Sequence, residues 1–333
     1  MLVVMKKDAA EKDIQAVVDA AEKRGFTAQP IAGGDRVSIG ILHNKGSVDT
    51  GMFQGFASVR EVIAVTKPYK LVSREIKNKN TLVKVGENIF GDGSLPVIAG
   101  PCAIETMDQA IETAKAVKKA GAGLFRGGAF KPRTSPYSFQ GLGEEGLKIL
   151  ARVREETGLP VVTEVMDCEN FAMVEEYADV VQIGTRNMQN YSLLKRAGKS
   201  AGPVILKRGM SATLQEWLMA AEYIMEEGNP NVILCERGVR TFVRHSRNTL
   251  DLSVVMAVKK ESHLPVIVDP SHAAGVRDQV IPLAFAATCV GADGLMIEVH
   301  YKPLQARSDG AQSLYPDQFR ECMDKINAIH SLI

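Results

Sequence analysis

Residues 124–146 read LFRGGAFKPRTSPYSFQGLGEEG and carry the pattern that decides the fold: an apolar strand, a loop and the start of a helix. The strand is predicted over Gly123–Arg126, and the helix begins at Glu144. The ten residues from Arg126 to Ser135 contain three cations, Arg126, Lys131 and Arg133, and two hydroxyl side chains, and no acid follows until Glu144. The paired glycines of the loop let the backbone approach a ligand closely, and its prolines stiffen the chain. We therefore predict an anion-binding loop, with a solvated surface loop as the plainer alternative.

The same strand–loop–helix unit recurs from residue 95 onward. Candidate strands, each short and rich in β-branched residues, cover Pro96–Ala99, Gly123–Arg126, Pro160–Glu164, Val180–Ile183, Pro203–Lys207, Asn231–Glu236, Pro265–Asp269 and Gly294–Val299. Helical segments follow at Met107–Ala120, Glu144–Thr157, Asn170–Tyr177, Tyr191–Ala197, Thr213–Glu227, Thr249–Lys260, Arg277–Val290 and Pro316–Ile329. Eight such units in roughly 235 residues predict an α/β fold, a TIM (β/α)8 barrel over residues 94–333. A doubly wound open sheet is the alternative, but no GxGxxG pattern follows the first strand.

Composition limits the class of protein. The chain has 333 residues, of which 45% are hydrophobic and 24% charged, and its formal net charge is +1. This balance gives no support for nucleic-acid or membrane binding, so any attraction for anions must be local. The five cysteines are widely spaced without a CxxC pair, which favours a reducing cytoplasm over a disulfide framework. The first apolar run is too short for a signal peptide, and no run is long enough to span a bilayer.

Residues 1–66 are predicted to form a separate small domain. Strands are expected over Leu2–Met5, Thr27–Ile31, Arg36–Leu42 and Val59–Thr66, helices over Asp8–Arg24 and Val48–Gly55, and a hairpin turn at Gly33–Asp35. This β-α-β-β-α-β order is the ferredoxin-like pattern. Because the domain contains no cluster of catalytic residue types, we expect it to serve regulation or assembly. Residues 67–93 follow as a solvated basic linker, up to Asn80, and a hairpin that closes the barrel.

Reactive side chains stand where the predicted barrel strands end. They are Cys102, Arg126, Lys131, Glu164, Arg186, Lys207, Arg237, His272 and Glu298, with Asp309 in the last loop. Strand alternation directs Lys207 inward with Ile205, and Arg237 inward with Cys235. A charge in a barrel mouth is costly unless it meets an opposite charge, and the acids look too few to pair all these cations. We therefore expect a small ligand that carries phosphate and carboxylate groups.

Four of these residues have the chemistry of a metal site. Cys102, His272, Glu298 and Asp309 offer a thiolate, an imidazole and two carboxylates, a set suited to divalent Mn, Fe, Co or Zn. Taken singly, each has a plainer explanation, since a lone cysteine is usually a small buried hydrophobe. Their positions at the strand ends of one barrel keep the metal hypothesis open beside that explanation.

Several motifs together resemble a known enzyme family. They are Gly100–Cys102, Arg126–Pro136, Gly184–Asn187, Leu206–Gly209, Cys235–Gly238 and Asp269–His272. The chain is similar to the 3-deoxy-D-arabino-heptulosonate 7-phosphate (DAHP) synthases, in particular the Iβ type with an N-terminal ferredoxin-like domain. That family condenses phosphoenolpyruvate with erythrose 4-phosphate, as the first step of the shikimate pathway to the aromatic amino acids.

The resemblance implies roles for the site residues. It makes Cys102, His272, Glu298 and Asp309 metal ligands. It assigns the phosphate and carboxylate of phosphoenolpyruvate to Arg126, Lys131, Arg186, Lys207 and Arg237, and erythrose 4-phosphate to Lys131, Arg133, Thr134 and Ser135. Lys131 is the expected proton donor near the aldehyde. Glu164 either orients the attacking water or pairs with one of the arginines. The resemblance also implies a homotetramer.

Three alternatives remain open at this point. The sister enzyme that makes 3-deoxy-D-manno-octulosonate 8-phosphate (KDO8P) from arabinose 5-phosphate shares the fold, but has Lys-Ala-Asn-Arg-Ser where this chain has Lys-Pro-Arg-Thr-Ser at residues 131–135. The small domain resembles a sensor of tyrosine or phenylalanine, against the alternative of a passive oligomerisation module. A non-catalytic phosphate-binding barrel is the most distant alternative.

Overall fold

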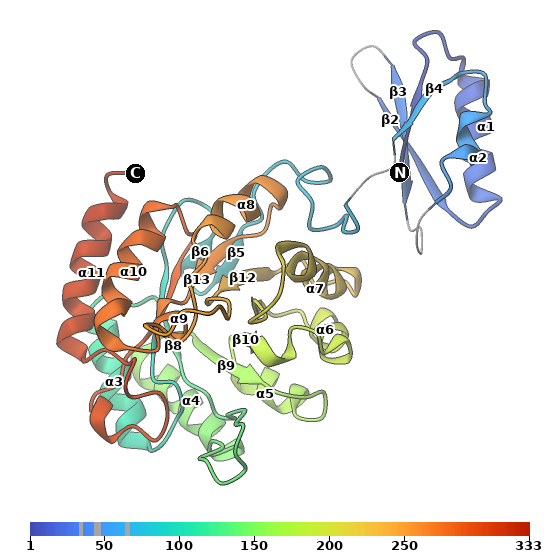
Figure 1. Cartoon of the computed structure of the whole chain (residues 1–333). Coiled ribbons are helices and arrows are strands. Elements are labelled where there is room, and N and C mark those ends of the chain that lie inside the picture. Colours follow the sequence, from blue (N-terminus) through green and yellow to red (C-terminus); the bar gives the residue numbers. More distant parts are fainter. Residues whose placement is uncertain (33–35, 43–47, 64–66) are drawn as a thin grey trace. The chain divides into compact units, whose positions relative to one another are not determined.

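The computed structural model describes residues 1–32, 36–42, 48–63 and 67–333 (Figure 1). The chain folds as two compact units, Met1–Pro68 and Tyr69–Ile333. The predicted hairpin turn at Gly33–Asp35 lies outside the described residues. None of the helices in the described part of the chain has the length and apolar character that crossing a membrane requires.

The first unit is a four-stranded antiparallel sheet with two helices. Its elements in chain order are β1 (Leu2–Met5), α1 (Glu11–Glu22), β2 (Thr27–Ala32), β3 (Val37–Leu42), α2 (Gly51–Gln54) and β4 (Val59–Ile63). The strands lie in the order β2-β3-β1-β4, so β1 pairs with β3 and β4 on either side. Val3 and Met5 alternate with more exposed neighbours and share one core with Val17 and Phe53 of the helices. This arrangement confirms the predicted ferredoxin-like fold.

The second unit contains a closed eight-stranded parallel barrel, which confirms the predicted TIM barrel and excludes an open sheet (Figure 1). Its strands are β7 (Val97–Gly100), β8 (Leu124–Arg126), β9 (Val161–Val165), β10 (Val180–Ile183), β11 (Val204–Lys207), β12 (Val232–Glu236), β13 (Val266–Val268) and β14 (Leu295–Glu298). The chain order of the strands is their order around the barrel, and β14 pairs with β7 to close it.

Helices surround the barrel strands. They are α3 (Met107–Lys119), α4 (Glu144–Thr157), α5 (Phe171–Tyr177), α6 (Tyr191–Gly198), α7 (Leu214–Glu226), α8 (Ser253–Glu261), α9 (Pro270–Ala274), α10 (Arg277–Cys289) and α11 (Pro316–His330), with short 3-10 turns at Thr185–Asn187 and Pro303–Gln305. Side-chain oxygens cap the first turns of α3, α6, α7 and α9. Thr213 and Glu216, for example, form a capping box at the start of α7.

Strand alternation divides the hydrophobic core into two parts. Side chains such as Ile205, Ile233 and Met296 point into the barrel, whereas their neighbours pack outward under the helices. The hairpin of β5 (Val83–Val85) and β6 (Asn88–Phe90) packs against the inner cluster. It lies at the N-terminal ends of the strands, where the side chain amide of Asn88 donates to the carbonyl of Gly123 (3.0 Å). The opposite, C-terminal end of the barrel is where TIM barrels place their active sites.

The basic segment that precedes the hairpin differs from the expected solvated linker, because from Tyr69 onward it packs on the barrel. The Glu222 carboxylate of α7 accepts three successive backbone N–H groups, those of residues 70–72, at 2.8–3.0 Å. The Tyr69 hydroxyl donates to Glu261 of α8 (3.1 Å), and His263 contacts both Thr81 and the carbonyl of residue 71 at 2.7 Å. Carboxylates and a histidine distant in sequence therefore hold this segment.

Candidate active site

The C-terminal ends of the strands surround a cavity of about 310 Å³. Its wall contains most of the predicted site residues, namely Lys131, Arg133, Thr134, Ser135, Glu164, Arg186, Lys207, Arg237, His272 and Asp309. Three further predicted residues, Cys102, Arg126 and Glu298, are buried and are not part of the wall. The structure therefore brings together side chains from all eight β/α units of the barrel.

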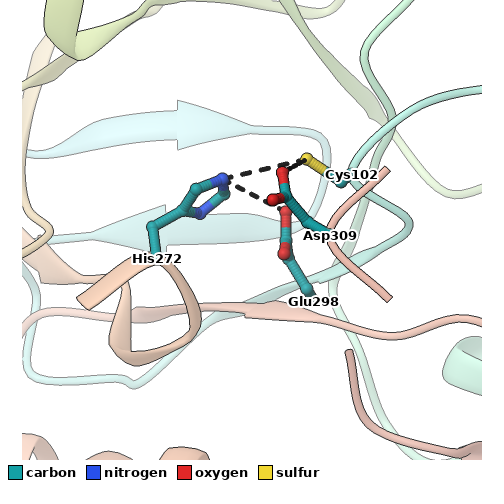
Figure 2. Close-up of side chains that lie close together, drawn as sticks. All are labelled: Cys102, His272, Glu298 and Asp309. Atoms are coloured by element: carbon teal, nitrogen blue, oxygen red, sulfur yellow. Dashed lines mark hydrogen bonds and ion pairs between the residues drawn. The ribbon is translucent and has the colours of Figure 1, made fainter. Parts of the chain in front are cut away.

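Four of these side chains converge beside the cavity (Figure 2). One ligand-type atom from each of Cys102, His272, Glu298 and Asp309 lies within 4.8 Å of all the others. The Cys102 sulfur is 2.9 Å from Asp309 Oδ2 and 3.8 Å from His272 Nε2, which is 3.2 Å from Glu298 Oε1. Separations of this size suit atoms that share one transition-metal ion at about 2.0–2.3 Å. The donor set and its geometry thus fit a divalent cation.

The histidine is oriented as a ligand requires. Its Nδ1 atom contacts the Asp269 carboxylate at 2.7 Å, which leaves Nε2 facing the cluster. Asp269 also caps the backbone N–H of His272 (2.9 Å) at the start of α9. Burial lowers the pKa of His272, against the opposing effect of Asp269 and Glu298, so the ring stays neutral at neutral pH. A carboxylate behind a neutral imidazole is the usual support of a metal-binding histidine.

The thiol is protonated while no ion is bound. Burial, reinforced by Glu298, raises the pKa of Cys102 to about 12, although Lys131 and Arg126 oppose the shift. The thiol donates to Asp309 Oδ2 and accepts a hydrogen bond from the Lys131 ammonium. A transition metal binds the thiolate form, so metal binding at Cys102 would release a proton.

Three of the five inward cations have acidic partners, which corrects the expectation that the protein cannot pair them. The pairs are Arg126 with Glu298 (2.7 Å), Lys131 with Asp309 (3.2 Å) and Lys207 with Asp269 (2.5 Å). All three acids stand at or beyond the ends of the last two strands, far in sequence from the cations. The local sequence contains no sign of these long-range pairs.

Arg237 has no such partner in the part of the chain that the structure describes. Its side chain is buried, with 5% of its surface exposed, and its Nε atom lacks a hydrogen-bond partner within the described residues. Its remaining bond is a long one from Nη1 to the carbonyl of Gly238 (3.4 Å). Burial lowers the pKa of Arg237, an effect that Asp269 partly offsets. Together with the exposed Arg186 on the same cavity wall, it leaves an uncompensated positive region that calls for an anion.

The loop quoted at the outset touches the last loop of the barrel. Arg133 donates to the hydroxyl of Ser308 (2.9 Å), and the guanidinium of Arg307 stacks over the ring of Phe139 at 3.8 Å. Thr134 and Ser135 are exposed on the cavity wall. The cations and hydroxyls of this loop thus line the same cavity as Arg237, which suits a second anionic group.

Glu164 lies at the end of β9 and lines the cavity. Its carboxylate accepts a hydrogen bond from Gln182 (3.1 Å), and no described arginine lies within ion-pair distance of it. Gly184 makes room for this side chain, because a Cβ atom at that position would lie 1.9 Å from Glu164 Oε1. Of the two alternatives for Glu164, the arginine pair is therefore absent from this structure.

Sequence reasoning missed several residues that support the site. Asp269 was identifiable, since an aspartate followed by proline with histidine three residues later is a helix N-terminus pattern. Arg247 and Gln312 have no such local signal. Arg247 donates to both Asp309 (3.3 Å) and Gln312 (3.3 Å), and Gln312 donates to Glu298 (2.5 Å).

Comparison with known proteins places this geometry in a family. Residues 74–332 match the model of the DAHP synthetase I family, and residues 1–67 match that of the DAHP synthase ferredoxin-like domain. A phospho-2-dehydro-3-deoxyheptonate aldolase of Thermotoga maritima is 47% identical over 329 residues, covering 99% of this chain and 97% of the relative. A 2-dehydro-3-deoxyphosphooctonate aldolase of Syntrophotalea carbinolica is 33% identical over 271 residues, covering 75% of this chain and 96% of that protein.

Solved structures agree. The crystal structure of the Thermotoga maritima phospho-2-dehydro-3-deoxyheptonate aldolase (DAHP synthase) superposes with a TM-score of 0.80 at 46% identity, covering 99% of this chain and 97% of that one. A truncated form of the Thermotoga maritima enzyme covers 79% of this chain and 97% of its own length, with a TM-score of 0.75. Because both of its domains match this family and a 47% identical relative covers 99% of it, the chain belongs to the DAHP synthetase I family.

Proposed function

We propose that this chain condenses phosphoenolpyruvate with D-erythrose 4-phosphate and water to give DAHP and inorganic phosphate, with the help of a divalent cation. The observation that carries the proposal is the buried Arg237, which has no acidic partner among the described residues and lines a cavity beside four possible metal donors. A dianionic enol phosphate supplies the missing charge. Family membership and the 47% identical relative support the same reaction.

The first step forms a carbon–carbon bond. Arg186, Lys207 and Arg237 would hold phosphoenolpyruvate by its phosphate and carboxylate, with its C3 atom toward the aldehyde of erythrose 4-phosphate. A divalent cation at Cys102, His272, Glu298 and Asp309 would supply Lewis acidity toward that aldehyde. As C3 attacks, the aldehyde oxygen takes a proton and becomes a hydroxyl. Lys131 is the donor that we propose, because its ammonium lies beside the cluster and faces the cavity.

The second step releases phosphate. Water adds to the electron-poor C2 atom and loses a proton; the C2–O bond to the phosphate then breaks as the new C2 hydroxyl gives its proton to the phosphate and becomes the ketone. We propose Glu164 as the group that orients this water, since its carboxylate faces the cavity without an arginine partner. The guanidinium and ammonium groups stabilise the charge on the leaving phosphate, which is where preorganised cations contribute most.

The acceptor sugar is the main choice left to test. Arg133, Thr134 and Ser135 would bind the phosphate of erythrose 4-phosphate. The alternative is KDO8P synthesis from arabinose 5-phosphate, because relatives at 33–35% identity are named 2-dehydro-3-deoxyphosphooctonate aldolases. Those relatives match less of this chain, 75% and 71%, than the 99% matched by the heptonate aldolase.

A phosphate-release assay separates these possibilities. Purified protein with Mn(II) and phosphoenolpyruvate should turn over erythrose 4-phosphate at least tenfold faster than arabinose 5-phosphate. EDTA should abolish turnover, and added Mn(II) should restore it. A preference for arabinose 5-phosphate would make the chain a KDO8P synthase. Phosphate release that is unaffected by EDTA would contradict the proposed dependence on a metal ion. If neither sugar leads to phosphate release, the non-catalytic phosphate-binding barrel is the remaining alternative.

Two further properties belong to the proposal. The ferredoxin-like domain would bind tyrosine or phenylalanine and inhibit the barrel, as feedback on the shikimate pathway requires. We base this proposal on the β-α-β-β-α-β fold of the domain and on the absence of a catalytic cluster among its described residues, and passive assembly stays the alternative. We also propose that the chain works as a homotetramer, in line with the family resemblance.

A further inference from the structure

The two oxygens of the Glu298 carboxylate have different surroundings. Oε1 faces the cluster, where it lies 3.2 Å from His272 Nε2 and accepts a hydrogen bond from Arg126 (2.7 Å). Oε2 points to the other side and accepts a hydrogen bond of 2.5 Å from the side chain amide of Gln312. Gln312 is buried, with 2% of its surface exposed, so this bond is shielded from water. Only one oxygen of Glu298 is therefore presented to an ion.

The two carboxylate oxygens of Asp309 also have different surroundings. Its Oδ2 atom faces the cluster, 2.9 Å from the Cys102 sulfur and 3.2 Å from the Lys131 ammonium. Its Oδ1 atom accepts a hydrogen bond from Arg247 Nη1 at 3.3 Å. Asp309 is also the one non-glycine residue in the described part of the chain with a positive φ, 52°, so its backbone sits in a conformation that surrounding contacts must maintain.

The two residues that hold the outer oxygens are joined to each other. Arg247 Nη1 donates one hydrogen to Asp309 Oδ1 and can donate its second to Gln312 Oε1, which is also 3.3 Å away. Gln312 in turn donates to Glu298, and its backbone N–H donates to the carbonyl of Asp309 (3.3 Å). One continuous bridge thus runs from Glu298 through Gln312 and Arg247 to Asp309.

We propose that Gln312 and Arg247 are positioning residues of the cation site. Each holds one oxygen of a carboxylate and so leaves a single oxygen of Glu298 and of Asp309 to bind the ion. The inference rests on the proposed metal-dependent function and goes further, because it assigns the way in which both acids bind. Two one-oxygen carboxylates, a thiolate and an imidazole give a low coordination number, typical of transition metals with cysteine and histidine ligands. Two-oxygen carboxylate binding belongs to the larger oxygen shells of calcium.

The test is the binding of Co(II), whose absorption spectrum reports its ligands and their number. Metal-free protein is titrated with Co(II) chloride, and the dissociation constant and the visible bands are recorded. In Gln312→Met, a substitution of similar size, Oε2 of Glu298 loses its donor and the carboxylate is free to turn. We expect the Kd for Co(II) to rise about 10–100-fold, the range for the loss of a residue that supports a metal ligand, with a changed spectrum.

Arg247 allows positioning to be separated from charge. Removing a cation near the site by Arg247→Gln would tighten Co(II) binding if Arg247 acted only through its charge. If it positions Asp309, Kd should instead rise, by several-fold rather than more because 44% of the side chain is exposed. Arg240→Gln is the matched control, since it removes the same charge from the same loop and Arg240 has no contact with either carboxylate.

The outcomes are distinct. A rise of tenfold or more in Gln312→Met, with Arg240→Gln unchanged, supports the proposal. A smaller rise, or a Gln312→Met protein whose metal-free melting temperature falls while its Co(II) parameters match wild type, overturns it and leaves Gln312 a structural role. Tighter binding in Arg247→Gln overturns the role of Arg247. If wild-type protein fails to bind Co(II), the metal-dependent function itself fails.

Discussion

Arg237 shows how a single residue links burial to substrate affinity. Its guanidinium is buried and has no acidic partner among the residues that the structure describes, so an anionic ligand gains a contact that the free protein does not make. Arg237→Lys keeps the charge but loses the planar fork that matches a phosphate or carboxylate. We expect KM for phosphoenolpyruvate to rise about tenfold or more, since a hydrogen bond to a charged group contributes roughly 1.5–3 kcal/mol. Steady-state kinetics check this, with Arg240→Lys as the control. A KM within twofold of wild type would contradict it.

Cys102 sets the pH dependence of metal binding. Its pKa is raised to about 12, so the thiol is protonated near neutral pH. It must release this proton to the solvent when it binds the ion. Protons therefore compete with the metal, and affinity should fall about tenfold for each unit that the pH drops. Titration calorimetry in buffers of different ionisation enthalpy should show one proton released per ion. Cys102→Ser should lose most of this release, and a pH-independent affinity in wild type would contradict the prediction.

For single residues, the sequence predicted the direction in which a side chain points better than it predicted the residue with which that side chain pairs. Alternation placed Cys235 inside the barrel and Arg237 at its mouth, as the structure has them. The partner of Lys207 was not predictable, because Asp269 follows it by 62 residues and meets it only through barrel closure. The alternation of side chains along a strand predicts which face of the sheet a residue lies on. Its ion-pair partner depends on which other strands lie nearby, and that is decided by the fold.

Among the elements, the segment from Tyr69 to Thr81 depends on a neutral histidine. His263 contacts Thr81 through Nδ1 and the carbonyl of Leu71 through Nε2, and burial lowers the pKa of this histidine. A lowered pKa in the folded state means that the unfolded chain binds the proton more readily. Stability is therefore kept above pH 6.5, the unfolded value, and lost as the pH falls below it.

Chemical unfolding measured at pH 7.5, 6.5 and 5.5 tests this contribution. His263→Gln should be less stable than wild type at pH 7.5, and the difference should shrink toward pH 5.5 because the glutamine does not titrate. His245→Gln, at an exposed histidine of the barrel mouth, is the control. A difference that stays constant with pH would show that His263 contributes packing alone.

The same segment marks where element prediction stops. The eight strands follow from apolar runs and the helices from their periodicity, and each was found within a few residues. The sequence did not predict that residues 69–72 pack on the barrel, because this packing depends on Glu222 of α7, about 150 residues away. The five-residue helix α9 was likewise too short for periodicity, although its Asp-Pro start was present in the sequence.

At the scale of the whole molecule, the division into two units makes the regulatory hypothesis testable. Deleting Met1–Pro68 removes the first unit and leaves Tyr69 and the contacts of residues 70–72 with Glu222 intact. A truncated form of the Thermotoga maritima enzyme, which covers 79% of this chain, has a solved structure of its own. We expect the deletion to keep kcat and KM within about threefold, since the cavity and the four possible metal ligands lie wholly in the second unit. The deletion should also abolish inhibition by tyrosine or phenylalanine. Assays of both proteins across a range of each amino acid decide the matter. An intact chain that neither amino acid inhibits, or a deletion that stays sensitive, would contradict the sensor role and leave assembly as the function of the small domain.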